Sequence, residues 1–386
     1  MANNNDNKVL NVPHLRFPEF SGEWKMCTIG ELITKVGSGV TPRGGEAVYK
    51  TEGHPFVRSQ NVGLGNLLLD DIAFIDEETH LRQKNTELQF NDVLLNITGA
   101  SIGRSALVDK QIVGGNVNQH VCIIRTKENL VPSFICSFLL SNYGQRQIDS
   151  FQAGGNRQGL NFEQIKSIKI TIPSKDEQIK IAKLLRAIDE RIATQNKIID
   201  KLQSLIKGLR VCCMQRNGSN NVYLSEIAQI YQPQTISSAE LTEDGFLVYG
   251  ANGIIGKYKD YNHKTEQICI TCRGNTCGMV NYTKPMSWIT GNAMVINTDK
   301  YQDKVYKKYL YHYLSAYNFN SIISGSGQPQ IVRTPLEKLK ITLPTISEQK
   351  QKAMILDKIQ DKIEINHNIL NLYILQKQYL LRQMFI

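Results

Sequence analysis

The sequence lacks the long apolar stretches that mark membrane and secreted proteins. No apolar run approaches the roughly 18 residues that a membrane helix needs, and the polar first residues, 1–6, contain no apolar core of a secretion signal. We therefore expect a cytoplasmic protein with no membrane partner. In that reducing environment, its eight cysteines are predicted to be free thiols.

A recognisable metal site is also missing. Cys269, Cys272 and Cys277 lie near His263 with a spacing that loosely resembles a zinc site, but Cys269 falls in an apolar run and no second Cys-x-x-Cys pair exists. We interpret them as buried strand cysteines. The seven histidines are scattered, without the paired spacing of a metal site, and we expect them to have surface or capping roles.

The signatures of catalysis are missing as well. The sequence has no GxxxxGK[ST] phosphate loop, no glycine-rich loop of a cofactor-binding βαβ unit and no Asn-Pro-Pro-aromatic run of the amino-methyltransferase type. An enzyme with Cys272 or Cys277 as nucleophile is an alternative, but neither has a histidine in a recognisable signature to activate the thiol. We predict that the chain performs no bond chemistry and holds no cofactor.

Positive charge, by contrast, is in excess. The 45 lysines and arginines outnumber the 35 acidic residues, which gives a net charge of +10 and a pI near 9.1. Clustered basic side chains displace condensed counterions from nucleic acid, so a polyanion is a candidate partner. The length of 386 residues and the hydrophobic content of 41% predict about two domains with apolar cores.

The second half of the chain repeats the first. The sequence KITIP at 169–173, followed by Glu-Gln at 177–178, returns as KITLP at 340–344, followed by Glu-Gln at 348–349. An offset of about 170 residues is too long for a solenoid repeat of roughly 20 to 50 residues. Each copy is therefore predicted to be a globular module with a helix.

A long helix is predicted after each proline, because apolar residues recur there in the alternating steps of four and three that form a coiled-coil seam. The two seams are Ile181, Leu185, Ile188, Ile192, Gln195, Ile199, Leu202, Ile206, Leu209 and Cys213, and Lys352, Leu356, Ile359, Ile363, Asn366, Leu370, Tyr373, Lys377, Leu380 and Met384. Each helix would have about 38 residues and a length of roughly 57 Å. In an antiparallel pair, the amides of Gln195 and Asn366 would lie close together and fix the register; alternatively, one of them points to solvent.

The segments before these helices predict an α+β fold with two mixed, mostly β domains. Short apolar runs alternate with Gly and Asn turns, and a helix follows in each copy. The expected strands and helices are 93–97, 121–124 and 132–143 in the first copy and 268–270, 293–296 and 306–317 in the second. The predicted domains are 1–158 and 218–330, and the regions with the long helices are 159–217 and 331–386. Since the modules diverge more than the helical segments do, we expect two different ligands at a fixed separation.

Several motifs together resemble the specificity subunit of type I restriction-modification enzymes. They are the opening Val12–Phe20, the turn Gly37–Pro42, the turn Gly99–Arg104 and the duplicated proline, Glu-Gln and helix segment. The resemblance covers almost the whole chain. The second module departs from the family pattern, because Gln232–Thr235 stands where the glycine-threonine-proline turn would be.

The resemblance implies two target-recognition domains that each recognise one half of a split DNA sequence, joined by two antiparallel helices that act as a spacer. It implies two methyltransferase subunits and restriction-translocase subunits as partners, which would hold the S-adenosylmethionine, ATP and Mg²⁺. If the modules lie at opposite ends of the paired helices, they would contact opposite strands at half-sites about one helical turn, or roughly 34 Å, apart.

Candidate contacts to DNA are the polar and basic residues in the turn-rich parts of each module. Arginine bound to guanine and Asn or Gln bound to adenine are the usual base contacts, whereas Lys and Ser more often bind phosphate. In the first module these candidates are Thr41, Arg43, Arg58, Ser59, Gln60, Asn61 and Arg104; in the second they are Tyr249, Asn252, Lys257, Arg273 and Asn275. For each residue, the alternative is a structural role in a solvated turn.

Two other interpretations of the whole chain stay open. One is a specificity subunit of a related enzyme in which cleavage and methylation share one partner chain. The other is a scaffold whose coiled coil binds partner helices and whose modules bind protein, in which case the complex would have no sequence-dependent affinity for DNA.

Overall fold

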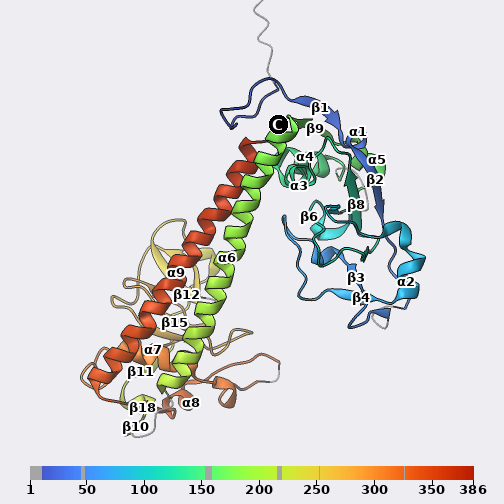
Figure 1. Ribbon diagram of the computed structural model, residues 1–386. Coiled ribbons are helices and arrows are strands. Elements are labelled where there is room, and N and C mark those ends of the chain that lie inside the picture. The colour runs from blue at the N-terminus through green and yellow to red at the C-terminus, as the bar shows by residue number, and fades with distance from the viewer. Residues whose placement is uncertain (1–10, 45–47, 153–158, 215–219, 252, 326) are drawn as a thin grey trace, which may run out of the picture. The chain divides into compact units, whose positions relative to one another are not determined.

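The protein divides into two units that each combine a mixed domain with parts of two long helices (Figure 1). The computed structural model describes residues 11–44, 48–152, 159–214, 220–251, 253–325 and 327–386. Unit 1 consists of Met1–Asn196 and Ile369–Ile386, and unit 2 consists of Lys197–Asn368. Within the described residues, no helix is long and apolar enough to cross a membrane.

The main sheet of unit 1 has four antiparallel strands in the order β2 (Ile33–Ser38), β8 (Val121–Thr126), β5 (Val93–Asn96) and β6 (Ser105–Leu107). Side chains alternate between its faces: Val93 and Leu95 of β5 pack into the core that includes α3 (Pro132–Leu140), whereas Leu94 packs into the cluster on the other side. Because both faces are covered, β5 is buried along its whole length, which explains its continuous apolar sequence.

Smaller elements complete unit 1. Strand β3 (His54–Val57) pairs antiparallel with β4 (Ala73–Ile75) and parallel with β7 (Asn116–Val117). Strand β1 (Lys25–Thr28) pairs with β9 (Lys169–Ile172). The helices of the module are α1 (Ile29–Leu32), α2 (Glu77–Arg82), α3 (Pro132–Leu140), α4 (Asn142–Ser150) and α5 (Phe162–Ser167). The single helix predicted at 132–143 is thus two helices, because Ser141 is extended and its hydroxyl caps α4.

Unit 2 repeats this architecture strand for strand. Its main sheet has the order β11 (Gln229–Tyr231), β17 (Ala293–Asn297), β14 (Ile268–Thr271) and β15 (Val280–Tyr282), all antiparallel. Strand β12 (Phe246–Gly250) pairs antiparallel with β13 (Gly253–Tyr258) and parallel with β16 (Trp288–Ile289), and β10 (Asn220–Tyr223) pairs with β18 (Lys340–Leu343). Helices α7 (Lys307–Ala316) and α8 (Arg333–Glu337) cover the module. The predicted α+β fold and internal repeat are confirmed.

The long helices are α6 (Lys175–Met214) and α9 (Ile346–Gln383). In unit 1, Leu185 near the start of α6 shares a core with Leu380 near the end of α9. In unit 2, Ile206 near the end of α6 packs with Leu356 near the start of α9. The helices therefore run antiparallel along the predicted apolar seam.

The two polar seam residues belong to different units, so their predicted pairing stays a prediction. Gln195 is buried in unit 1. Asn366 is half-buried in unit 2, and its amide donates a hydrogen bond of 2.6 Å to the carbonyl oxygen of Lys362 in the same helix.

Candidate nucleic-acid interface

A polar pocket of about 410 Å³ lies in unit 1 beside the turn that follows β5. It contains three of the predicted contacts, Ser59, Gln60 and Arg104. Its lining residues are Ser59, Gln60, Thr98, Gly99, Ala100, Ser101, Arg104 and His120. The glycines make the turn possible, because Gly99 and Gly103 have φ angles of +75° and +84°, which other residues rarely adopt.

Asn96 holds the loops of this pocket together from below. It is completely buried at the end of β5, and its side-chain amide donates to the carbonyl oxygen of Ser59 at 2.8 Å and to the hydroxyl of Ser101 at 3.0 Å. One asparagine thus connects the two loops that border the pocket. This accounts for a polar residue at the end of a buried strand.

Residues 58–61 are organised by Asp71. The guanidinium of Arg58 donates to the Asp71 carbonyl oxygen at 2.7 Å and lies over the ring of Tyr49, with 5.4 Å between Cζ and the ring centroid. Gln60 donates to the Asp71 carboxylate. The Arg58 side chain is only 25% exposed, and its contacts hold this loop in place.

Asn61 has a structural role that the sequence did not predict. It is completely buried, its oxygen accepts from the backbone N–H of Arg58 at 2.9 Å, and its amide donates to Leu68 and Asp71, both at 2.9 Å. The amide is fully used within the loop. Asn61 is therefore unsuited to contact a base and shapes the turn for its exposed neighbours.

The segment with Thr41 and Arg43 is fixed from two sides. The backbone N–H of Val40 donates to Gln83 at 3.2 Å, and that of Thr41 donates to Gln119 at 2.8 Å. Gly39 is required here, because a Cβ atom would lie 1.7 Å from the carbonyl oxygen of Val117. Thr41 is half-buried, whereas Arg43 is exposed.

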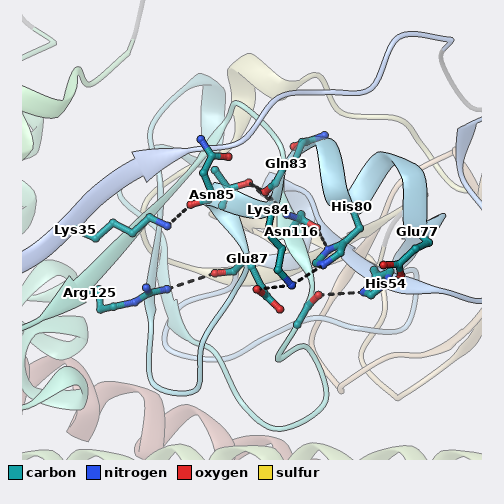
Figure 2. A network of polar contacts seen from close by, with 12 residues as sticks. Lys35, His54, Glu77, His80, Gln83, Lys84, Asn85, Glu87, Asn116 and Arg125 are labelled. Atoms are coloured by element: carbon teal, nitrogen blue, oxygen red, sulfur yellow. Dashed lines mark hydrogen bonds and ion pairs between the residues drawn. The ribbon is translucent and has the colours of Figure 1, made fainter.

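Gln83 belongs to a network around two stacked histidines (Figure 2). The rings of His54 and His80 are parallel, with 3.8 Å between their centroids. His54 pairs with Glu77 at 2.6 Å, and His80 bonds to the side-chain oxygen of Asn116 at 2.8 Å. The Asn116 amide donates to the Gln83 carbonyl oxygen at 2.9 Å. The network therefore holds Gln83 in place. The side chain of Gln83 in turn accepts the hydrogen bond from the backbone N–H of Val40, next to Thr41.

The expectation of surface or capping histidines is wrong for three of them. His80, His263 and His312 are all buried. His263 bonds to the hydroxyl of Tyr231 at 2.8 Å, and His312 bonds to Asp357 at 3.0 Å. Burial lowers the pKa of both His263 and His312. Within the described residues, no group of three or more His, Cys, Asp and Glu residues could hold a metal ion.

Unit 2 has a second pocket, with a volume of about 370 Å³, beside the turn that follows β14, the strand equivalent to β5. Its lining residues are Tyr231, Gln232, Arg273, Met294, Gln330, Ile331, Val332 and Arg333. Arg273 pairs with Gln330 in an isolated β-bridge, as Thr98 does with Gly159 in unit 1. Gln330 and Arg333 were not predicted as site residues, because they are far from Arg273 in the sequence. The β-bridge brings Gln330 to Arg273, and the segment after it brings Arg333 to the same pocket.

The other predicted contacts of unit 2 differ in accessibility. Asn275 is exposed on the turn after Arg273, and Lys257 is half-buried on β13, 3.4 Å from the carboxylate of Asp244. Tyr249 is buried and its hydroxyl accepts from the backbone N–H of Lys284 at 3.1 Å. Burial raises the pKa of Tyr249. The role of Tyr249 is therefore structural. The remaining candidate, Asn252, lies outside the described residues.

Of the three cysteines predicted to be buried in strands, Cys269 is buried in β14 and Cys272 is buried just after it. The prediction is wrong for Cys277, which is half-buried in the turn that follows. Burial raises the pKa of Cys269 to about 12 and also raises that of Cys277. A raised pKa suppresses the thiolate form that nucleophilic attack requires.

The fold defines a duplicated protein whose two modules share a strand order and differ in the residues that line their pockets. The chain belongs to the family described as the type I restriction modification DNA specificity domain, whose model matches residues 21–204 and 217–372. The predicted family is thereby confirmed, with one matched segment for each copy of the repeat.

Individual relatives agree with this assignment. The chain is 25% identical over 404 residues to the type I restriction enzyme MjaVIII specificity subunit of Methanocaldococcus jannaschii, covering 91% of this chain and 88% of that one. It is 32% identical over 140 residues to the EcoprrI specificity subunit of Escherichia coli, covering 35% of this chain and 34% of that one. The crystal structure of an S subunit from M. genitalium has the same fold, with a TM-score of 0.67, 17% identity and coverage of 97% and 99%.

Proposed function

We propose that this chain is the DNA-recognition subunit of a type I restriction-modification complex and that each module binds one half of a bipartite target. The observation that carries the proposal is the duplicated module. The same strand order recurs in both units, and a pocket borders the residue two positions after the equivalent strands β5 and β14, which is Thr98 in one unit and Arg273 in the other. Two modules of the same topology with different polar residues suit two different half-sequences of DNA.

The proposed contacts are the predicted donors that the structure leaves at least partly exposed. In unit 1 they are Arg43, Gln60 and Arg104, with Thr41 and Ser59 beside them; in unit 2 they are Lys257, Arg273 and Asn275. The guanidinium groups can donate two hydrogen bonds to guanine or bind phosphate, and the amides can pair with adenine. Arg58 and Asn61 position the first loop, and Tyr249 supports the second module.

The long helices are the proposed spacer and the proposed assembly platform. Two methyltransferase subunits and the restriction-translocase subunits would bind the chain, and S-adenosylmethionine, ATP and Mg²⁺ would belong to those partners. This assignment rests on family membership. One solved relative of the same fold is described as revealing complex assembly in a type I system, with 16% identity and a TM-score of 0.56.

Methylome sequencing tests the proposal directly. A host that carries the gene with its partner genes should methylate a split sequence with two specified halves and a fixed gap, and deletion of the gene should abolish that pattern. A partner chain that combines cleavage and methylation would indicate the related enzyme. If the purified complex lacks sequence-dependent affinity for DNA, the chain is a protein-binding scaffold instead.

A further inference from the structure

A chain of hydrogen bonds runs from Thr41 to Thr98, which lines the unit 1 pocket. The backbone N–H of Thr41 donates to Oε1 of Gln119 at 2.8 Å. Nε2 of Gln119 lies 3.2 Å from Nε2 of His120, and Nδ1 of His120 lies 2.6 Å from Oγ1 of Thr98. We call these four residues the Thr41–Thr98 relay. Gln119, His120 and Thr98 were not among the predicted contacts.

The direction of every bond in the relay follows from its first member. A backbone N–H can only donate, so the side-chain oxygen of Gln119 must face Thr41 and its NH₂ group must face His120. Nε2 of His120 must then accept, which leaves the proton of a neutral ring on Nδ1. That proton is donated to the hydroxyl oxygen of Thr98.

The hydroxyl proton of Thr98 is consequently left for another partner. Its oxygen already accepts from His120, and among the residues described by the structure no acceptor is seen for its own proton. Thr98 lines the pocket together with Arg104, whose side chain is exposed. The pocket therefore presents a directed hydroxyl donor and a cationic guanidinium to whatever enters it.

Unit 2 carries a donor at the equivalent position without a relay. Thr98 is the second residue after β5, and Arg273 is the second residue after β14, the matching strand of the repeated sheet. Both residues also form the matching β-bridge, and each lines the pocket of its own unit. Arginine has donors and no acceptor. Both modules therefore present a hydrogen-bond donor at this position, a hydroxyl in unit 1 and a guanidinium in unit 2.

We propose that Thr98 donates a hydrogen bond to an acceptor atom of the DNA, with its polarity set by the relay, and that Arg273 is its counterpart in unit 2. The inference rests on the proposed function, because it assumes that the pocket faces DNA. The acceptor is either a base atom, such as O6 or N7 of guanine, or a phosphate oxygen. Thr98 is in this view a DNA-contact residue, and Gln119 and His120 are positioning residues.

The contact is tested by two substitutions of Thr98 in the assembled complex. Thr98→Val keeps the shape of the side chain and removes the hydroxyl. We therefore expect about tenfold weaker binding to the target sequence that methylome sequencing identifies, as for loss of one hydrogen bond to a polar or charged group. Thr98→Ser keeps the hydroxyl and should bind within about twofold of the wild type. Dissociation constants are measured by fluorescence anisotropy at fixed salt, with the melting temperature as a check on folding.

A panel of duplexes, each changed at one position, identifies the acceptor. Loss of discrimination at one base by Thr98→Val supports a base contact, and a loss of affinity that is uniform across the duplexes supports a phosphate contact. If Thr98→Val binds every duplex as the wild type does, the inference is wrong while the proposed function stands. If the wild-type complex itself binds without sequence dependence, both fail.

The relay has its own spectroscopic test. In the full-length chain labelled with ¹⁵N-histidine, we expect His120 as the neutral ring protonated on Nδ1, which long-range ¹H–¹⁵N correlation spectra distinguish from the Nε2-protonated form. The His120→Gln variant assigns the signal. The Nε2-protonated form or a doubly protonated ring at neutral pH would overturn the relay, whatever the binding data show.

Discussion

Gln178 and Gln349 are buried residues that make the same three hydrogen bonds in the two copies of the repeat. In each, the side-chain oxygen accepts from the backbone N–H at the start of a helical segment, Val131 at 2.9 Å and Tyr306 at 2.8 Å. Each amide donates to two backbone carbonyl oxygens, one of which belongs to the proline before the long helix. The conserved Glu-Gln pattern between the copies is thus explained by the docking of each module on its helix.

We predict that Gln178→Ala and Gln349→Ala each lower the free energy of unfolding by about 2 to 3 kcal/mol. The reason is that each change leaves a buried N–H and two carbonyl groups without partners. Urea denaturation of the full-length chain measures the effect, and Gln203→Ala, at an exposed position of α6, is the control that should change it by less than about 0.5 kcal/mol. Equal effects of all three variants would contradict the docking role.

Residue roles in the loops were the hardest to predict from sequence. Arg104 and Arg273 were chosen for their donors and do line pockets, but Asn61 and Tyr249 were chosen on the same grounds and are buried. Side-chain type does not determine exposure in a turn, because exposure depends on strands far away in the sequence. No sequence pattern marked His120 as a site residue, because its partner Thr98 lies on another loop and only folding brings the two together.

Elements with a regular period were predictable. The steps of four and three specified α6 and α9 and their seam, and the duplicated proline segment specified where both begin. The strand order was not predictable, because pairing such as that of β1 with β9 joins residues more than 140 positions apart. The repeat nevertheless implied that whatever topology the first module had would recur in the second, and it does.

The spacer role of α6 and α9 leads to a prediction at the scale of elements. Insertion of four residues into both helices, after Asn196 and after Asn368, adds about one turn, or roughly 6 Å, at the boundaries between the units. We expect the gap between the half-sites to lengthen by one to two base pairs with both specified halves unchanged. Methylome sequencing measures the gap, and deletion of four residues from both helices should shorten it. An unchanged gap would reject the spacer role.

If each module recognises one half-site, as proposed, Thr98→Val and Arg273→Ala should act additively. The residues belong to different units, and they contact different residues: Thr98 contacts His120 and Gly159, and Arg273 contacts Gln330. We expect each variant to weaken binding about tenfold, and the double variant to show the product of the two factors within about twofold, as for distant sites. Each should relax a different half of the target in the duplex panel.

Lys300→Ala, at an exposed cation of unit 2, controls for the loss of charge. Loss confined to the same half-site, or a double variant no weaker than the single ones, would mean that the modules do not divide the target between them.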